Sequence, residues 1–431
     1  MNKKNVRTIL DTWLATKLAY ERIPGMVVGI VKDGEVVYKN AFGFADWEKH
    51  ERMETSHAFF IASISKTFTA IALRQLEISG KLKFSDRVFK YVPWLIDTGS
   101  PGKKVTVKQL LSHSSGIWRD GDGDQWSSGK FPSISNIQAS LSTNTFTGHA
   151  GYKYSNFGFM LLGQVIEAAS GMTYNEYVKK HILQPLKMSH TATDLDFCNE
   201  RIASGYGRDI PGQRRTKFHH THIGPYSSAT GFVSTVDDLA KYCTALLDGR
   251  LPFLKLSKPQ VTFDSEGLGY GLGFRLKKMG SKILAGHSGG YQGFATRITL
   301  DAENRLAVIT LTNTNAKAAL EVNFGILKLM HAFGKSQKNV SKKFLEYTGL
   351  YRSFWSDSQV IALGNNLICF NPKTSSPLKV TERFESFGKD VFIIHTTDPM
   401  GDHGERVRFR RNAQGKINAY LQSGLLFQKI S

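Results

Sequence analysis

The chain lacks the features that mark disulfide-rich and membrane-spanning proteins. Its three cysteines, Cys198, Cys243 and Cys369, are odd in number and widely spaced, so they indicate no disulfide framework and are expected as buried hydrophobic side chains. No stretch approaches the roughly 18 apolar residues that a membrane span requires. Prolines are few, 12 in 431 residues, and 41% of the residues are hydrophobic. The sequence therefore predicts a folded protein of two or three domains without a membrane span.

No secretion signal is predicted at the start of the given sequence. Lys3 and Lys4 give the start of the chain the charge of a signal peptide, but Arg7 and Asp11 interrupt the stretch after them, which has no small-residue cleavage site. Residues 5–22 are predicted to form an amphipathic helix instead. The expected location is cytoplasmic, or periplasmic or secreted if a leader has been removed.

Acidic residues are comparatively scarce. The chain has 56 Lys and Arg against 36 Asp and Glu, a net charge of +20, and the excess is spread along its length. The densest basic stretch, residues 406–411, predicts a strand with Arg406, Arg408 and Arg410 pointing outward. A solvated strand face is favoured over a nucleic-acid surface, so no nucleic-acid partner is expected. The positive charge favours the approach of anionic substrates.

One motif has a direct chemical meaning: Ser63-Ile64-Ser65-Lys66 at the start of a predicted helix. Residues three apart share a helix face, so the Lys66 amine is placed over the Ser63 hydroxyl. A serine hydroxyl is a poor nucleophile at neutral pH and needs a neighbouring base and a site for the oxyanion that it generates. Free N–H groups at a helix start are suited to binding that oxyanion.

Two further motifs lie later in the chain. Tyr154-Ser155-Asn156 lies within residues 151–158, and His287-Ser288-Gly289-Gly290 comes after the strand-like residues 282–285. In this order the three motifs resemble those of the serine β-lactamase and penicillin-binding-protein superfamily. The resemblance extends over much of residues 10–335. It is closest to the class C branch, which includes D-amino-acid peptidases and carboxylesterases.

The resemblance implies an α+β fold and a catalytic role for the first two motifs. An antiparallel sheet flanked by helices is expected beside an all-helical lobe, with the site between them. Ser63 is expected to be the nucleophile that forms an acyl-enzyme. Lys66 and Tyr154 are expected to act together as base and acid, with pKa values moved from ~10.4 and ~10 by burial and close approach. Which of the two holds the proton stays open at this stage.

The resemblance also implies a substrate-binding set. Asn156 is expected to position the acyl group and Lys66 through its amide. The backbone N–H groups of Ser63 and Gly290 are expected to form the oxyanion hole, which suits the small Gly289-Gly290 pair. His287, Ser288 and Gly289 are also expected to bind the substrate. Neither a metal nor a cofactor is expected.

His287 departs from the Lys-Thr-Gly of class C β-lactamases. A lysine offers a permanent cation to the substrate's carboxylate, whereas histidine is mostly neutral at pH 7. The departure favours esters or D-amino-acid amides and peptides as substrates, with β-lactamase or D-Ala-D-Ala carboxypeptidase activity as the alternative. Arg297 is a candidate for the missing charge, but a surface strand arginine is the preferred interpretation.

Other polar groups are expected to be structural. His219, His220 and His222 lack an obvious carboxylate or cysteine partner, so no metal site is predicted there. His113 is expected to be a structural hydrogen-bonding residue.

A calcium loop is not predicted either. Asp120, Asp122 and Asp124 alternate as in an EF-hand, but Gln125 and Phe131 stand where that loop requires glycine and glutamate.

The chain is predicted to hold two domains. Residues 335–339 look like a linker, and roughly seven or eight short strand candidates come after it, as in a small barrel. Residues 347–351 resemble the opening of lipocalin-like domains appended to some relatives. The expected domains are a β-lactamase-like serine hydrolase domain at residues 1–335 and a lipocalin-like antiparallel β-barrel at residues 340–431.

Two other function classes compete with the hydrolase. One is a scaffold or assembly protein that keeps the fold without turnover, and the other is a basic binding module that uses the barrel. The presence of Ser63, Lys66, Tyr154 and Asn156 favours a hydrolase of small esters, amides or peptides. The acyl and leaving groups, the turnover of β-lactams and the role of the barrel stay open, and a homo-oligomer is compatible with the sequence.

Overall fold

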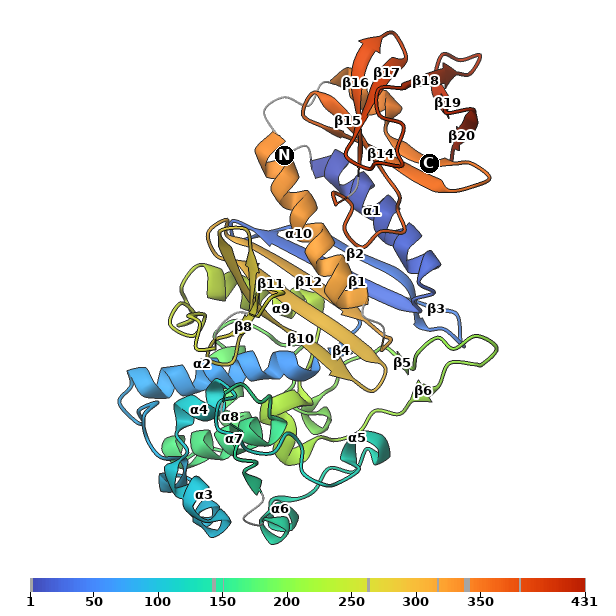
Figure 1. Cartoon of the computed structure of the whole chain (residues 1–431). Helices are drawn as coiled ribbons and strands as arrows, with labels where there is room; N and C mark the ends of the chain where they lie inside the picture. The colour runs from blue at the N-terminus through green and yellow to red at the C-terminus, as the bar shows by residue number, and fades with distance from the viewer. Residues whose placement is uncertain are drawn as a thin grey trace. The chain divides into compact units, whose positions relative to one another are not determined.

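The chain forms two compact units, each with its own hydrophobic core. The computed structural model describes residues 3–141, 145–149, 151–261, 264–315, 318–336, 342–379 and 381–430 (Figure 1). One unit holds residues 24–320, and the other combines residues 1–23 with residues 321–431.

The larger unit is built on an antiparallel sheet in the order β3-β2-β1-β12-β11-β10-β9-β8. The N-terminal hairpin therefore pairs with strands from the end of the unit, as the family resemblance implies. Asp33 and Gly34 form the hairpin turn with positive φ angles of 54° and 87°, which a tight hairpin turn requires. The strands are β1 (Gly25–Lys32), β2 (Glu35–Asp46), β3 (Glu51–Arg52), β8 (Leu268–Tyr270), β9 (Arg275–Met279), β10 (Lys282–Tyr291), β11 (Phe294–Asp301) and β12 (Leu306–Thr312).

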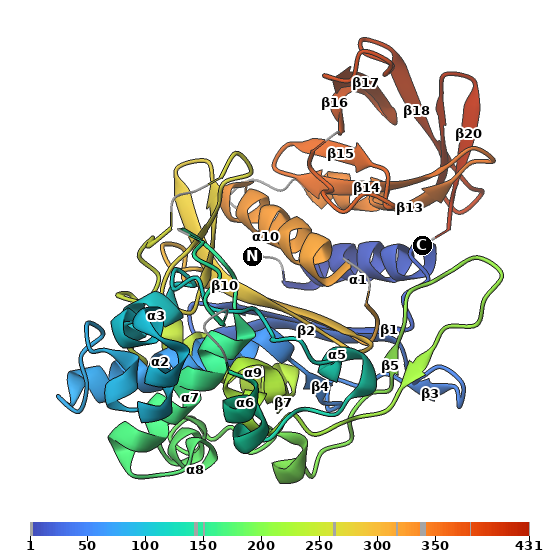
Figure 2. The ribbon, with the colours of Figure 1, turned by 60° about the horizontal axis from the view of Figure 1, so that its bottom comes forward.

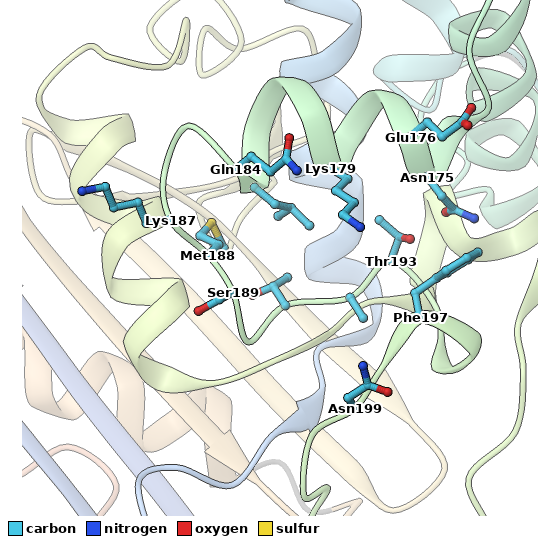
Figure 3. A pocket seen from close by; sticks show the side chains of 13 residues that line it. Asn175, Glu176, Lys179, Gln184, Lys187, Met188, Ser189, Thr193, Phe197 and Asn199 are labelled. Atoms are coloured by element: carbon cyan, nitrogen blue, oxygen red, sulfur yellow. The ribbon is translucent and has the colours of Figure 1, made fainter.

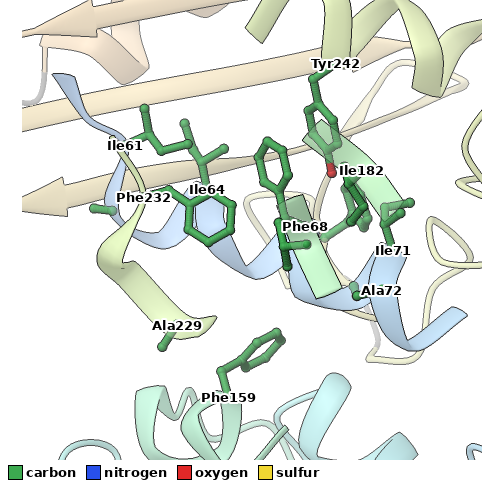
Figure 4. Packing of buried hydrophobic residues seen from close by; sticks show 14 of the residues in the cluster. Ile61, Ile64, Phe68, Ile71, Ala72, Phe159, Ile182, Ala229, Phe232 and Tyr242 are labelled. Carbon is green, nitrogen blue, oxygen red and sulfur yellow. The ribbon is translucent and has the colours of Figure 1, made fainter. Parts of the chain in front are cut away.

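Helices gather on one side of this sheet (Figures 1 and 2). They include α2 (Ser65–Ile78), which is buried along most of its length. Its Phe68 stacks on Tyr242 with ring centroids 3.9 Å apart and meets Phe232 at 4.9 Å (Figure 4). Because side chains on several faces of α2 are packed, the helix has a fixed position under the sheet. The other helices of this unit are α3 (Ser100–Lys104), α4 (Val107–Leu111), α5 (Gln125–Ser128), α6 (Ile134–Ser140), α7 (Asn156–Ser170), α8 (Tyr174–Val178) and α9 (Val236–Leu247).

The smaller unit contains a closed antiparallel barrel of eight strands, β13 to β20, which confirms the predicted barrel (Figure 2). Closure leaves no unpaired strand edge. The ring of Phe409 belongs to its core and lies 4.8–6.4 Å from the rings of five other aromatic residues. Arg406, Arg408 and Arg410 of β18 are exposed, as their alternation predicts. The strands are β13 (Gly349–Arg352), β14 (Asp357–Leu363), β15 (Asn366–Phe370), β16 (Glu382–Gly388), β17 (Val391–Thr396), β18 (Arg406–Arg411), β19 (Ile417–Gln422) and β20 (Leu425–Lys429).

The first helix of the chain, α1 (Lys3–Tyr20), belongs to the unit that holds the barrel. Its Trp13 is fully buried, and the indole N–H donates to the carbonyl oxygen of Thr374 at 3.1 Å. The side-chain amide of Gln359 in β14 donates to the carbonyl oxygen of Ile9 at 3.0 Å. This unit, which also holds most of α10 (Ala318–Ser336), is therefore assembled from both ends of the chain.

The sequence predicts two domains that meet at residues 335–340. This boundary stays a prediction. Residues 337–341, which include most of the predicted linker, lie outside the described residues. Within the described part of the chain, the helices are too short or too polar to cross a membrane.

Replacing Trp13 with alanine should destabilise the unit that holds the barrel. Deleting a buried tryptophan side chain costs about 3–5 kcal/mol, from lost apolar burial and the cavity left behind. Trp355→Ala is the matched control, because Trp355 lies in the same unit with its side chain 72% exposed. Urea unfolding monitored by circular dichroism should show a lower midpoint for Trp13→Ala alone. Equal midpoints for the two variants would contradict the packing of α1 in this unit.

Candidate active site

Ser63 lies in a strained turn that leads into α2. The 3₁₀ turn η1 (Ala62–Ile64) precedes the helix, and Ala62 has a φ of 47°, which is costly for a residue with a Cβ atom. The hydroxyl of Ser65 holds this turn: it donates to the carbonyl oxygen of Ala62 at 2.6 Å and accepts from the N–H of Phe232 at 3.1 Å. The two serines of the motif therefore have different tasks, and only Ser63 presents its hydroxyl to the site.

The amine of Lys66 lies between Ser63 and two acceptors. Lys66 is fully buried, and its Nζ lies 3.1 Å from Ser63 Oγ, 2.6 Å from Asn156 Oδ1 and 2.7 Å from the carbonyl oxygen of Ala229. Burial lowers the pKa of Lys66 well below its usual value. A neutral amine has two N–H groups and one lone pair. In the neutral form the two acceptors take these hydrogens and the lone pair faces Ser63, whereas in the protonated form a third N–H donates to Ser63 Oγ.

Tyr154 contacts Ser63 from another side. Its hydroxyl donates to Ser63 Oγ at 2.8 Å. Burial raises the pKa of Tyr154, against the opposing effects of the bond to Ser63 and of nearby arginines. The two shifts have opposite directions: burial favours the protonated phenol of Tyr154 and the neutral amine of Lys66.

Asn156 is placed by the start of α7. Ser155 caps that helix by accepting from the N–H of Gly158 at 2.7 Å. Asn156, the first helical residue, directs Oδ1 to Lys66 and donates from Nδ2 to Asp120 Oδ1 at 2.7 Å. Three consecutive residues therefore have different contacts: Tyr154 binds Ser63, Ser155 caps α7 and Asn156 binds Lys66.

The third motif lies in β10, with Gly289 against the turn that carries Ser63. A Cβ atom on Gly289 would lie 2.1 Å from the carbonyl oxygen of Ile61, so no other residue fits there without moving the backbone. Gly290 borders open space. The close approach of strand and turn agrees with an oxyanion hole formed by Ser63 and Gly290, which stays a prediction.

His287 does not present a cation to the site. It is fully buried, and burial lowers its pKa well below the usual value. Its Nδ1 lies 2.7 Å from the carbonyl oxygen of Ser288, which can only accept, so Nδ1 carries the hydrogen. Its Nε2 lies 3.1 Å from the hydroxyl of Tyr270 and is left as an acceptor.

Tyr270 links His287 to His113, which completes a directional chain of hydrogen bonds. The N–H of Ser155 donates to His113 Nδ1 at 3.1 Å, so His113 Nε2 carries the hydrogen and donates to Tyr270 at 3.1 Å. Tyr270 then donates to His287. Burial also lowers the pKa of His113. The chain joins the loop before α7 to β10 and agrees with the structural role predicted for His113.

Two arginines other than Arg297, the sequence candidate for the missing charge, lie over the Tyr154 ring. Arg297 is 5% exposed and donates from Nε to Thr299 at 2.8 Å, so its predicted surface position is wrong. The guanidinium carbons of Arg119 and Arg275 lie 5.3 Å and 5.7 Å from the centre of the Tyr154 ring. Arg275 pairs with Gly286 across β9 and β10, a register that the sequence did not reveal.

The histidine cluster is not gathered around one point. His222 Nδ1 pairs with Asp196 Oδ1 at 2.6 Å, so a carboxylate partner exists where the sequence suggested none. His220 Nε2 lies 3.2 Å from the carbonyl oxygen of Ala203. Within the described ranges, no group of three or more potential metal ligands is present.

A cavity of about 590 Å³ opens elsewhere on the larger unit, around the end of α8 (Figure 3). Lys179, Asn175 and Phe197 are among its lining residues, whereas Ser63, Lys66 and Tyr154 are not. It is therefore separate from the site built on Ser63.

Comparisons with known proteins agree with this geometry. A family model described as Beta-lactamase matches residues 10–328. Penicillin-binding protein 4* of Bacillus subtilis (strain 168) is 29% identical over 335 residues, which cover 72% of each protein. Protein flp of Staphylococcus aureus (strain MW2) is 26% identical over 320 residues, which cover 72% of this chain and 63% of that protein.

Solved structures show the same fold. The octameric penicillin-binding protein homologue from Pyrococcus abyssi gives a TM-score of 0.67 at 24% identity, over 97% of this chain and 99% of that one. D-amino acid amidase from Ochrobactrum anthropi SV3, solved with D-phenylalanine, gives 0.61 at 24% identity, over 73% and 92% of the two chains. A class C beta-lactamase gives 0.65 at 21% identity, over 76% and 97%.

Replacing Tyr270 with phenylalanine should destabilise the protein, because it leaves a hydrogen of His113 and the acceptor Nε2 of His287 unpaired in a buried place. Each orphaned group costs about 1–3 kcal/mol. Tyr177→Phe is the matched control, since Tyr177 is also buried but its hydroxyl makes no hydrogen bond recorded for the described residues. Thermal unfolding monitored by circular dichroism should place the midpoint of Tyr270→Phe clearly below that of Tyr177→Phe. A Tyr270→Phe midpoint equal to the wild type would contradict the hydrogen-bond chain.

Proposed function

Because the chain belongs to the beta-lactamase family, we propose that it is a serine hydrolase that works through an acyl-enzyme on Ser63. The observation that carries the proposal is the position of Ser63 Oγ, within hydrogen-bond distance of both Lys66 Nζ and the Tyr154 hydroxyl. A neutral amine as acceptor and a protonated phenol as donor are the base and acid that acyl transfer needs.

In acylation, Ser63 Oγ attacks the carbonyl carbon of the substrate as its proton passes to Lys66. The N–H groups of Ser63 and Gly290 stabilise the oxyanion of the tetrahedral intermediate. The bond to the leaving group then breaks, and the leaving atom takes the proton of Tyr154. The Lys66 ammonium returns a proton to Tyr154, so the acyl-enzyme regains the starting protonation state.

In deacylation a water molecule replaces the leaving group. Lys66 takes a proton from the water as its oxygen attacks the acyl carbon. The bond between this carbon and Ser63 Oγ breaks, and Ser63 recovers a proton through Tyr154 and Lys66. The products are a carboxylic acid and the free hydroxyl of Ser63.

The substrates that we propose are esters or D-amino-acid amides and peptides. The buried, neutral His287 supports this choice, because it offers no permanent charge to the carboxylate of a β-lactam. The likeness in fold to a D-amino acid amidase supports an amide substrate. The likeness to an octameric homologue supports a homo-oligomer as the working form.

A second candidate is a substrate with a carboxylate on its leaving group, such as a D-Ala-D-Ala peptide or a β-lactam. Arg275 favours it. Its guanidinium lies near Tyr154, the proposed proton donor to the leaving group, and its buried Nε has no hydrogen-bond partner among the described residues. A cation near Tyr154 would bind the carboxylate of the leaving group and so hold the leaving atom close to the hydroxyl of Tyr154.

A scaffold without turnover is the competing interpretation of the same fold. The close contacts among Ser63, Lys66, Tyr154 and Asn156 support a working catalytic set instead.

Hydrolysis should depend on Ser63. We expect D-alanine p-nitroanilide or p-nitrophenyl butyrate to be cleaved by the wild type and not by Ser63→Ala, measured as initial rates of colour release. Amide cleavage would identify a D-amino-acid peptidase, and ester cleavage alone an esterase. Ser65→Ala should fold less stably and still react with substrate, because Ser65 holds the turn and does not face the substrate. Equal rates for the wild type and Ser63→Ala would contradict the proposal.

Arg275→Gln should discriminate between the two substrate classes. A hydrogen bond to a charged group contributes about 1.5–3 kcal/mol, so kcat/KM for a D-Ala-D-Ala peptide with a free C-terminal carboxylate should fall by about 10- to 100-fold. The fall for the same peptide with an amidated C-terminus should be much smaller. Arg250→Gln, at an exposed arginine that pairs with Asp248, is the control. Equal losses on the two peptides would exclude carboxylate binding by Arg275.

A further inference from the structure

We propose that Asp120 is a positioning residue of this site: its carboxylate decides which way the Asn156 amide faces and places a negative charge behind Lys66. The inference rests on the proposed roles of Ser63, Lys66 and Tyr154. Asp120 belongs to the run of alternating aspartates that resembles a calcium loop, and neither the comparisons nor the sequence motifs give it a role. Its recorded side-chain bonds go to Asn156 and Arg119, not to Ser63.

The amide of Asn156 has one correct orientation. Its nitrogen can only donate and its oxygen can only accept, and a carboxylate can only accept. The 2.7 Å contact with Asp120 Oδ1 therefore assigns Nδ2 to that side, and Oδ1 is left to face Lys66 Nζ at 2.6 Å. A flipped amide would set its oxygen against the carboxylate and its N–H groups against the amine. Asn156 is 4% exposed, so water cannot readily replace either bond.

This orientation controls the lone pair of Lys66. The amine hydrogens go to Asn156 Oδ1 and to the carbonyl oxygen of Ala229. If the Asn156 amide turned, one of these hydrogens would lose its acceptor and the amine would be free to rotate. The lone pair would then no longer be held toward Ser63. Asp120 thus acts on the nucleophile through two intermediate side chains.

Asp120 is itself held firmly. Its Oδ2 accepts from Arg119 Nε at 3.1 Å, and its backbone oxygen accepts from the side-chain amide of the buried Gln125 at 2.7 Å. The carbonyl oxygen of Arg119 accepts from the N–H groups of Asn156 and Phe157, at 2.9 Å and 3.0 Å. The loop is therefore attached to the same helix start that carries Asn156, which keeps Asp120 in register with it.

The charge of Asp120 opposes the effect of burial on Lys66. Burial lowers the pKa of Lys66. The positive charges of Arg275 and Arg119 lower it further, and the negative charge of Asp120 raises it. Tyr154, His113 and His287 also face the amine, and burial keeps each of them uncharged. Asp120 therefore supplies the negative charge that keeps Lys66 basic enough to take a proton from Ser63.

These directions set the expected pH dependence. Lys66 acts as a base only when it is neutral, so the reactivity of Ser63 falls as the pH drops through the pKa of Lys66. Removing the charge of Asp120 lowers this pKa, and the acid side of the pH profile moves to lower pH. Burial lowers the pKa of Lys153, which the charge of Asp120 opposes, and burial raises the pKa of Tyr226, to which Asp120 adds. Neither of these residues contacts Ser63 in the described structure.

Two variants, Asp120→Asn and Asp120→Ala, separate the effect of the Asp120 charge on the pKa of Lys66 from its effect on the orientation of the Asn156 amide. Asparagine removes the charge and keeps an oxygen that can accept from Asn156, whereas alanine removes both. Asp122→Asn is the matched control, because Asp122 is an exposed residue of the same loop and its loss changes the net charge equally. Circular dichroism at each pH checks that the variants are folded.

The first measurement is the titration of Lys66 by NMR in protein labelled with ¹³C at the lysine ε-carbon, with the signal assigned by its loss in Lys66→Arg. We expect the titration midpoint in Asp120→Asn to lie below that of the wild type by about 0.5–1 pH unit, less than the ~1–3 units of a directly contacting partner. Asp122→Asn should match the wild type. An unchanged midpoint in Asp120→Asn, or an equal change in Asp122→Asn, would overturn the inference.

The second measurement is the rate at which a fluorophosphonate labels Ser63 as a function of pH. Labelling forms a bond from Ser63 Oγ to phosphorus and expels fluoride, while the serine proton goes to Lys66. The acid side of the profile should move down in both Asp120 variants, and the plateau should fall by about 10- to 100-fold only in Asp120→Ala. A plateau equal to the wild type in a folded Asp120→Ala would exclude the positioning role. An unlabelled wild type would instead count against the proposed function, and the titration would still decide the role of Asp120.

Discussion

The site depends on one buried amine. Lys66 is fully buried beside Ser63 and two oxygen acceptors, and burial favours its neutral form. In the proposed mechanism, this neutral amine takes the proton of Ser63. This requires that the amine be kept dry, that its hydrogens be occupied and that its lone pair point at one atom. Most of the surrounding structure serves these three requirements.

The burial of the amine comes from the packing around α2, where the rings of Tyr154 and Phe159 lie 4.9 Å and 5.4 Å from Lys66 Nζ. The occupied hydrogens come from Asn156 and from the backbone at Ala229. The approach of β10 comes from Gly289, where a side chain would collide with the turn before Ser63. These interactions join segments that lie far apart in the sequence, and all of them are made near Ser63 and Lys66.

His287 in the third motif is also a buried side chain whose neutral form is favoured. In place of a cation it contributes a neutral ring, held by Tyr270 in a chain of hydrogen bonds that reaches His113 and Ser155. A protonated ring at either end would leave one donor without an acceptor, so the chain and the burial favour the same uncharged state. The positive charge near Tyr154 comes instead from Arg119 and Arg275, on a loop and on β9.

The sequence by itself determined the family, the fold class, the closed barrel and the residues that meet at Ser63, because their motifs combine side-chain chemistry with short, regular spacing. It did not determine the directions of the pKa shifts, the buried place of Arg297, the contacts of Asp120, Tyr270 and Arg275, or the inclusion of the first helix in the unit with the barrel. Those depend on burial, strand register and long-range packing. Tertiary structure decided them because the pKa of a group and the direction of a hydrogen bond are set by the groups that surround it after folding, and that environment comes from residues distant along the chain.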